Sequence, residues 1–178
     1  MLVENTEIDV IFSADEIKLR IEELAKQISA ERLQNLLVVP VLKGSFIFAA
    51  DLIRALHGAG ISPEIDFMSL ASYRGTVSLG QVEIVRDINT SIESRDVLII
   101  DDILESGHTL AFAKDLLSAR GARRVMTCVL LEKPTRRAVE IEADFLAYRC
   151  PDVFVVGYGM DLDHRFRELP FVGRIAGR

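Results

Sequence analysis

Three short, almost wholly apolar runs separated by helical patterns constrain the fold of this chain most strongly. The runs cover residues 36–42, 97–100 and 125–131. The first ends at Lys43-Gly44, after which apolar residues recur at helical spacing, and the second leads through Gly107 to a helical pattern over 109–119. Strands that are apolar on both faces are typical of parallel sheets covered by helices on both sides. We therefore predict an α/β protein with a mostly parallel, twisted sheet flanked by helices.

The remaining segments are consistent with this pattern. Ser13 and Glu16 have the spacing of a capping box, which predicts that an amphipathic helix begins there. We expect loops over 72–80 and 101–107, where polar and small residues interrupt the periodicity. Further short strands are predicted at 65–70, 82–85, 145–147, 154–156 and 171–172. With 178 residues, of which 49% are hydrophobic and 27% charged, residues 1–178 are expected to form a single domain.

Charge and hydropathy exclude several classes of protein. The 21 basic and 27 acidic residues give a formal net charge of −6, which disfavours nucleic acid as a general partner. The apolar stretches are much shorter than the about 18 residues of a membrane helix, and the acidic first ten residues do not resemble a secretory signal. Cys128 and Cys150 lack the spacing of metal ligands. We therefore expect a cytoplasmic protein without a membrane partner.

The strongest indication of function lies in residues 97–110, VLIIDDILESGHTL. Three acids follow the apolar strand and a small polar segment then opens a helix: Asp101, Asp102 and Glu105, then Ser106, Gly107, His108 and Thr109. Backbone N–H groups at such a helix start can bind a phosphate. Neighbouring carboxylates that diverge from a strand can accept hydrogen bonds from sugar hydroxyls or from water on a metal ion. The alternative without a function is a turn in which these residues only cap the helix. Their combination after a buried strand instead indicates a site for a phosphorylated sugar.

This stretch resembles the phosphoribosyl diphosphate (PRPP) motif of the type I phosphoribosyltransferases. Further matches from residue 36 to about residue 171 narrow the resemblance to the hypoxanthine (hypoxanthine-guanine) phosphoribosyltransferase family. The resemblance implies the type I phosphoribosyltransferase fold with a small base-binding hood, and a homodimer or homotetramer. It also implies purine salvage, in which PRPP donates its 5-phosphoribosyl group to N9 of hypoxanthine, and also of guanine. The products would be IMP or GMP and diphosphate, with Mg2+ as the cofactor.

The resemblance assigns a role to individual residues. Glu105 would be the catalytic base that handles the N7 proton of the purine. PRPP would be bound by Lys43, Gly44, Asp101, Asp102, Ser106, Gly107, His108, Thr109 and Arg167, with a cis peptide before the lysine. A lid loop would begin at Ser72 and Tyr73. The purine would be bound by Lys133, which donates to the 6-oxo group, by Phe154, which stacks on the ring, by the Val155 backbone and by Asp161, which with Asp101 and Asp102 would also hold the metal.

Glu105 departs from the family pattern, which usually has aspartate at this position. Glutamate has a similar pKa in model peptides but one more methylene, so its reach to N7 differs. This leaves open a non-catalytic regulator with the same fold, although the overall acidity and the acid at position 105 favour the enzyme. A receiver-type domain, a dinucleotide-binding enzyme and a P-loop protein fit poorly, because the acidic pair is mid-chain, Leu162 replaces the third glycine of GxGxxG, and no Gly-Lys pair occurs. Adenine, xanthine and pyrimidine enzymes are closer alternatives. Lys133 and Phe154-Val155 favour a 6-oxopurine over adenine or a pyrimidine, whereas the use of xanthine stays open, because the contacts to the 2-position are mostly backbone.

Overall fold

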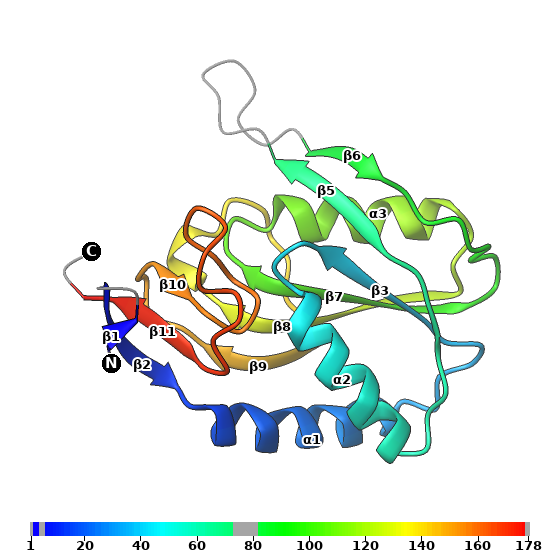
Figure 1. Cartoon of the computed structure of the whole chain (residues 1–178). Coiled ribbons are helices and arrows are strands. Elements are labelled where there is room, and N and C mark those ends of the chain that lie inside the picture. The colour runs from blue at the N-terminus through cyan, green and yellow to red at the C-terminus, as the bar shows by residue number, and fades with distance from the viewer. Residues whose placement is uncertain (1, 4–5, 73–81, 177–178) are drawn as a thin grey trace.

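The larger of two sheets forms the centre of the molecule (Figure 1). The computed structural model describes residues 2–3, 6–72 and 82–176. The strands of this sheet are β3 (Leu37–Leu42), β4 (Glu64–Ile65), β5 (Met68–Ser72), β6 (Val82–Arg86), β7 (Asp96–Leu104), β8 (Arg124–Glu132) and β9 (Phe145–Arg149). They are arranged in the order β6-β5-β3-β7-β8-β9, with β4 paired to β3, and only the β5–β6 pair is antiparallel. The predicted mostly parallel sheet is confirmed.

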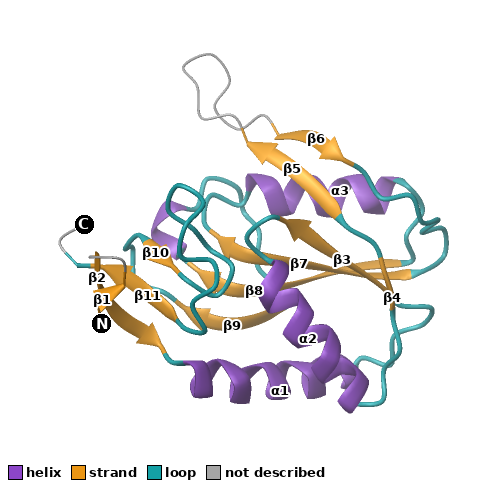
Figure 2. Ribbon diagram, viewed as in Figure 1, coloured by secondary structure: helices purple, strands orange, loops and turns teal. Residues whose placement is uncertain are grey.

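Helices cover both faces of this sheet, as Figure 2 shows. Helices α1 (Ala14–Ala30) and α2 (Phe46–Gly58) share one core with Leu98 and Ile100 of β7. Helix α3 (His108–Ala119) shares the other core with Val97 and Ile99. Since successive strand side chains point to opposite faces, β7 needs an apolar residue at each of these positions. The predicted capping box at the start of α1 is also present, because the Ser13 hydroxyl accepts from the Glu16 N–H and the Glu16 carboxylate accepts from the Ser13 N–H.

A smaller antiparallel sheet forms the predicted hood and contains both ends of the described chain. Its order is β1-β2-β11-β10, with β1 at Leu2–Val3, β2 at Thr6–Phe12, β10 at Val155–Val156 and β11 at Val172–Ile175. Ile8 in β2 is opposite Ile175 in β11, so residues 167 positions apart are paired. Strand β2 was not predicted, because in the run TEIDVIF only Ile8 is fully buried and the charged residues obscure the alternation.

Several sequence-based boundaries are wrong, among them those at residue 154, which precedes β10, and at residue 72, which belongs to β5 and not to the predicted loop. Residues 101–107 were predicted as a loop, but β7 continues to Leu104 because β8 remains paired with it, with Asp101 opposite Val129 and Ile103 opposite Leu131. The strand predicted at 65–70 is divided between β4 and β5. The last predicted strand, 171–172, corresponds to β11, which begins one residue later.

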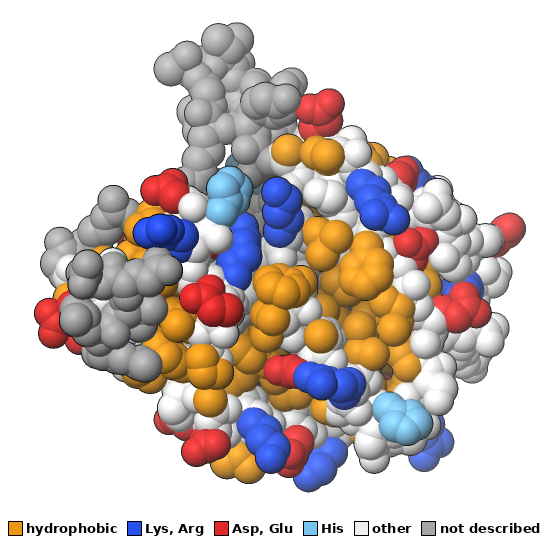
Figure 3. Space-filling model, viewed as in Figure 1, with side chains coloured by type: hydrophobic (Ala, Val, Ile, Leu, Met, Phe, Trp, Pro, Cys, Tyr) orange, Lys and Arg blue, Asp and Glu red, His pale blue; other side chains and the backbone are white. Residues whose placement is uncertain are grey.

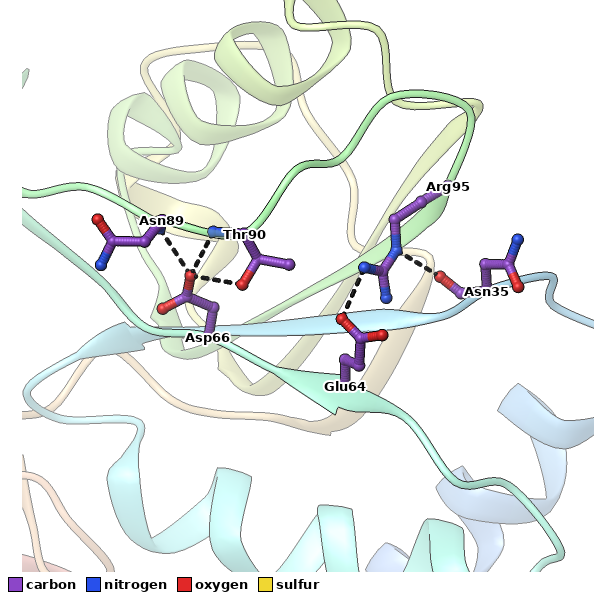
Figure 4. Close-up of polar contacts among 6 residues, drawn as sticks. All are labelled: Asn35, Glu64, Asp66, Asn89, Thr90 and Arg95. Atoms are coloured by element: carbon purple, nitrogen blue, oxygen red, sulfur yellow. Dashed lines mark hydrogen bonds and ion pairs between the residues drawn. The ribbon is translucent and has the colours of Figure 1, made fainter.

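A group of polar contacts fastens the segment before β7 to the sheet (Figure 4). One carboxylate oxygen of Asp66, in the link between β4 and β5, accepts from the backbone N–H groups of Asn89 and Thr90 and from the Thr90 hydroxyl, at 2.7–3.0 Å. Arg95 donates to the Asn35 carbonyl and to Glu64. Burial raises the pKa of Asp66, but hydrogen bonds from Thr90, Phe67 and Asn89 outweigh it and hold the pKa below its ordinary value. The segment that leads to β7 is thereby anchored beside β4 and β5.

None of the helices in the described ranges is both long and apolar enough to cross a membrane.

Candidate active site

A cavity of about 620 Å³ lies at the carboxyl ends of β3, β7 and β8, where loops of the hood meet the large sheet. Parallel sheets bind ligands at this edge. Nine of the residues predicted from the sequence line it: Lys43, Gly44, Asp102, Glu105, Lys133, Phe154, Val155, Asp161 and Arg167. The fold therefore brings together residues that are up to 124 positions apart in the sequence.

The turn after β3 approaches β7 closely. A Cβ atom on Gly44 would lie 1.6 Å from Oδ2 of Asp102, so no other residue fits at position 44 without displacing that carboxylate. Gly159 packs on the same turn, since a Cβ there would lie 2.2 Å from the Gly44 carbonyl oxygen. The Leu42–Lys43 peptide bond is cis, as the resemblance implies. The Lys43–Gly44 turn is thus in contact with both β7 and the hood loop.

The acidic pair lies within β7, where the two carboxyl groups interact with each other, although the sequence predicts that they diverge. Asp102 lines the cavity, whereas Asp101 does not and is only 7% exposed. Burial, together with the neighbouring Asp102 charge, raises the pKa of Asp101, and burial also raises the pKa of Asp102. A cation or hydroxyl donors near this pair would therefore stabilise its ionised form.

Glu105 follows β7 and faces two cations. Nη1 of Arg136 is 3.2 Å and Nζ of Lys133 is 3.7 Å from the same oxygen of Glu105, Oε1. Lys133 directly follows β8 and is only 5% exposed, yet it lines the cavity. A nearly buried ammonium that reaches a cavity is suited to donate to a polar atom of a ligand.

Four predicted PRPP-binding residues, Ser106, Gly107, His108 and Thr109, form the start of α3 and are not among the lining residues. The segment 137–141 packs against them. The Ser106 carbonyl accepts from the N–H groups of Ala138 and Val139, and a Cβ on Gly107 (φ +90°) would lie 2.8 Å from a methyl carbon of Ile141. Glycine is therefore required at position 107 by both its backbone conformation and its neighbour.

The two segments of the hood that reach the cavity differ in burial. Phe154 is 44% exposed, whereas Val155, the first residue of β10, is 3% exposed. Farther along the chain, Arg167 donates to the Gly159 carbonyl at 2.6 Å and pairs with Oδ1 of Asp161 at 2.7 Å. The other oxygen of Asp161 accepts from the backbone N–H of His164 at 2.8 Å. Asp161 and Arg167 thus form an oriented acid–base pair at the cavity wall.

The predicted lid residues are only partly described. Ser72 is the last residue of β5, and Tyr73 lies outside the described residues. Val153 and Met160 also line the cavity and belong to the segment 152–161 that resembles the base-binding segment of the family, although no role was assigned to them individually. Sequence reasoning missed Arg136 and several apolar lining residues. The signal for Arg136 was its position three residues after Lys133, one turn of the short 3-10 helix Pro134–Arg136.

Comparison with known proteins agrees with this geometry. The model of the phosphoribosyl transferase domain family matches residues 7–163. The hypoxanthine-guanine phosphoribosyltransferase of Dictyostelium discoideum is 42% identical over 94% of this chain and 94% of its own length. The hypoxanthine phosphoribosyltransferase of Escherichia coli is 40% identical over 94% of this chain and 95% of its own. This chain belongs to the hypoxanthine phosphoribosyltransferase family.

Other members of the hypoxanthine phosphoribosyltransferase family show the same relationship. The Trypanosoma cruzi enzyme in complex with the product IMP has a TM-score of 0.91 and 36% identity, covering 99% of this chain and 98% of that one. The Listeria monocytogenes bifunctional protein TilS/HprT is 46% identical over 92% of this chain, which spans about a quarter (25%) of that relative's length. The family, fold and enzyme class predicted from the sequence are confirmed.

Proposed function

We propose that this chain salvages purines by transferring the 5-phosphoribosyl group of PRPP to N9 of hypoxanthine, giving IMP and diphosphate, and that it also converts guanine to GMP. The observation that carries the proposal is the position of Lys133, a 5% exposed ammonium that reaches the cavity beside Glu105. Relatives named for this activity are 40–42% identical over nearly the whole chain. Salvage of a free base needs no macromolecular partner, in keeping with the net charge of −6.

Base recognition in this proposal depends on three residues. Lys133 donates to the 6-oxo group, Phe154 stacks on the ring with its exposed face, and Val155 uses its backbone groups to bind the edge of the pyrimidine ring. An ammonium accepts nothing, so the 6-amino group of adenine would face a donor and leave a buried charge without an acceptor. This predicts preference for 6-oxopurines over adenine.

PRPP would lie between the strand ends and the hood loop. The diphosphate is assigned to Lys43, the backbone of Gly44 and Arg167, which offer positive charge and N–H donors. The 5-phosphate is assigned to the start of α3, where Ser106, Gly107, His108 and Thr109 present backbone N–H groups and hydroxyls. The hydroxyls of the ribose are assigned to Asp101 and Asp102, since donors there would relieve the raised pKa values of this pair.

The residues also suit a magnesium ion. No group of three or more His, Cys, Asp or Glu in the described part of the chain forms a cage for a metal ion. Mg2+ commonly binds through one or two carboxylates together with substrate phosphates, and Asp102 and Asp161, which both line the cavity, would supply such ligands. A metal role for Asp101 stays a prediction, because this residue does not line the cavity. When bound, Mg2+ would neutralise charge on the departing diphosphate.

The chemical step requires a proton acceptor. N9 of the purine attacks C1 of the ribose as the bond from C1 to the diphosphate oxygen breaks, and Glu105 accepts the proton from N7. Arg167, held by Asp161 and the Gly159 carbonyl, is oriented to stabilise negative charge on the leaving group. The lid role of Ser72 and Tyr73 remains a prediction, as does the single domain over residues 1–178.

We also propose that this chain forms a homodimer or homotetramer and acts in the cytoplasm. Hydrophobic side chains gather around α2 and the strand segment before β5 on the face shown in Figure 3. Phe46, the first residue of α2, Ile65 in β4 and Phe67 just before β5 are each 39–42% exposed. Apolar patches of this kind are typical of interaction surfaces, and they support association of this chain with itself.

The test is product formation from PRPP and Mg2+ with hypoxanthine, guanine, xanthine or adenine in separate reactions. We expect IMP from hypoxanthine, GMP from guanine and far slower product formation from adenine. The rate with xanthine shows where that base ranks among the 6-oxopurines. PRPP binding without turnover of any base would instead favour the non-catalytic regulator, with Glu105 as the disabling change.

A further inference from the structure

Arg136, which lines the cavity, forms ion pairs with two acidic residues from different segments of the chain. Nη1 of Arg136 is 3.2 Å from Oε1 of Glu105, and Nε of Arg136 is 2.7 Å from Oδ1 of Asp152. Glu105 is the proposed base at N7, and Asp152 is two residues before Phe154, which is proposed to stack on the ring. Arg136 therefore joins two segments that would contact different parts of the same purine.

Arg136 also competes with Lys133 for Glu105. The distance of 3.7 Å from Nζ of Lys133 to Oε1 is too long for a hydrogen bond, whereas the 3.2 Å contact of Arg136 meets the criteria for one. The Lys133 side chain is 6% exposed and that of Glu105 is 25% exposed, so attraction between them is only weakly screened by solvent. Without Arg136, we expect Lys133 and Glu105 to close on each other.

A direct Lys133–Glu105 pair would impair both proposed contacts with the base. The ammonium would be turned from the 6-oxo group, and the carboxylate would be turned from N7. We propose that Arg136 is a positioning residue that holds Glu105 away from Lys133 and, through Asp152, sets the distance between Glu105 and the segment that binds the purine. This inference rests on the proposed function.

The same contacts should contribute little to stability. The Arg136 side chain is 55% exposed, and ion pairs at such positions are weak because solvent screens them. Its substitution should therefore change catalysis without unfolding the protein, so that kinetic measurements report on positioning.

The experiment compares Arg136→Met, which keeps the length but removes the charge and the donors, with Arg136→Lys, which keeps the charge but not the planar fork. The matched control is Arg124→Met. Arg124 pairs with Glu31 at 2.8 Å and is 45% exposed, but it lies at the opposite end of β8 from the cavity. Steady-state kcat and the KM values for hypoxanthine and PRPP are measured for each protein, together with the thermal midpoint.

We expect Arg136→Met to lower kcat/KM for hypoxanthine by about tenfold while the KM for PRPP and the thermal midpoint remain unchanged. Arg136→Lys should restore part of the loss, and Arg124→Met should match the wild type. In the Arg136→Met background, Asp152→Asn should cause no further loss, because the bridge is already broken.

Two results would overturn the role of Arg136 while the proposed function stands: an active wild type with unchanged kinetics in Arg136→Met, or fully additive losses for Arg136→Met and Asp152→Asn. A wild type that forms no IMP would instead overturn the proposed function and this inference with it.

Discussion

Replacing Lys133 by methionine tests base recognition most directly. Methionine has similar length and apolar character but neither charge nor donor, so Lys133→Met removes the proposed contact with the 6-oxo group while filling the same space. Because Lys133 is only 5% exposed, little water is available to replace that contact.

The structure sets the size of the effect. A hydrogen bond to a charged group contributes about 1.5–3 kcal/mol, and burial places Lys133 toward the upper part of that range. At about 1.4 kcal/mol for each factor of ten, kcat/KM for hypoxanthine should fall by about 10- to 150-fold. Adenine should lose nothing, since its amino group no longer faces an ammonium. The ratio of kcat/KM for hypoxanthine to that for adenine should therefore fall by at least the same factor.

The assay measures kcat/KM for both bases on the same protein preparation, with PRPP and Mg2+ saturating, so that partial inactivation cancels in the ratio. Lys114→Met is the matched control. Lys114 lies on α3, pairs with Asp144 at 3.5 Å and does not line the cavity. A Lys133→Met enzyme that keeps the wild-type ratio would refute the assignment of Lys133 to the 6-oxo group.

Three further predictions concern the proton acceptor, the diphosphate turn and the polar contacts at Asp66. Glu105→Gln should lower turnover by about 10²- to 10⁴-fold but leave PRPP affinity by calorimetry nearly unchanged, and near-native turnover would place the base elsewhere. Gly44→Ala should weaken PRPP binding in the same calorimeter, because its Cβ would displace the Asp102 carboxylate, and native affinity would contradict that reading. Asp66→Asn should cost about 1 kcal/mol of unfolding free energy at pH 7 in urea titrations. Because the pKa of Asp66 is lower in the folded protein, its ionised form stabilises the fold above the unfolded value of 3.8, and this stability is lost as pH falls through the folded pKa. The unfolding free energies of wild type and Asp66→Asn should therefore converge in acid. A difference between them that does not change with pH would exclude ionised Asp66 as its cause.

The elements that could be predicted from the sequence are those with a strong period. Strands β3 and β8 are almost wholly apolar, and the spacing of Ile17, Ile21, Leu24 and Ile28 specifies α1 with its capping box. The extension of β7 could not be predicted in this way. A prediction from hydrophobic periodicity ends the strand at its first charged residue, whereas in the structure pairing with β8 keeps Asp101 and Asp102 in the sheet.

The same division applies to the candidate site. Motif spacing identified Glu105 and Lys133, but it contained no information about their 3.7 Å separation or about the arginine that pairs with the same oxygen of Glu105. Arg136 and Arg137 are neighbours in the sequence and look equivalent there, yet Arg136 pairs with Glu105 and Asp152 whereas Arg137 pairs with Glu132. Only the fold of the chain after β8 distinguishes these two arginines.

The pairing of β2 with β11 has a consequence for the order in which the protein matures during synthesis. Strands β3 and β7 and the segments directly after them carry all of the proposed PRPP contacts except Arg167, and the central strands β3, β7 and β8 are complete once residue 132 has been made. Strand β10, which carries Val155, pairs only with β11 among the described strands, and β11 in turn needs the early residues of β2. A nascent chain can therefore build its phosphate-binding edge early, but it must retain an unpaired N-terminal strand until about residue 175 emerges. The base-binding wall is then the last part of the site to form, so a chain cut before β11 would keep the signature acids and lose the place where the purine stacks.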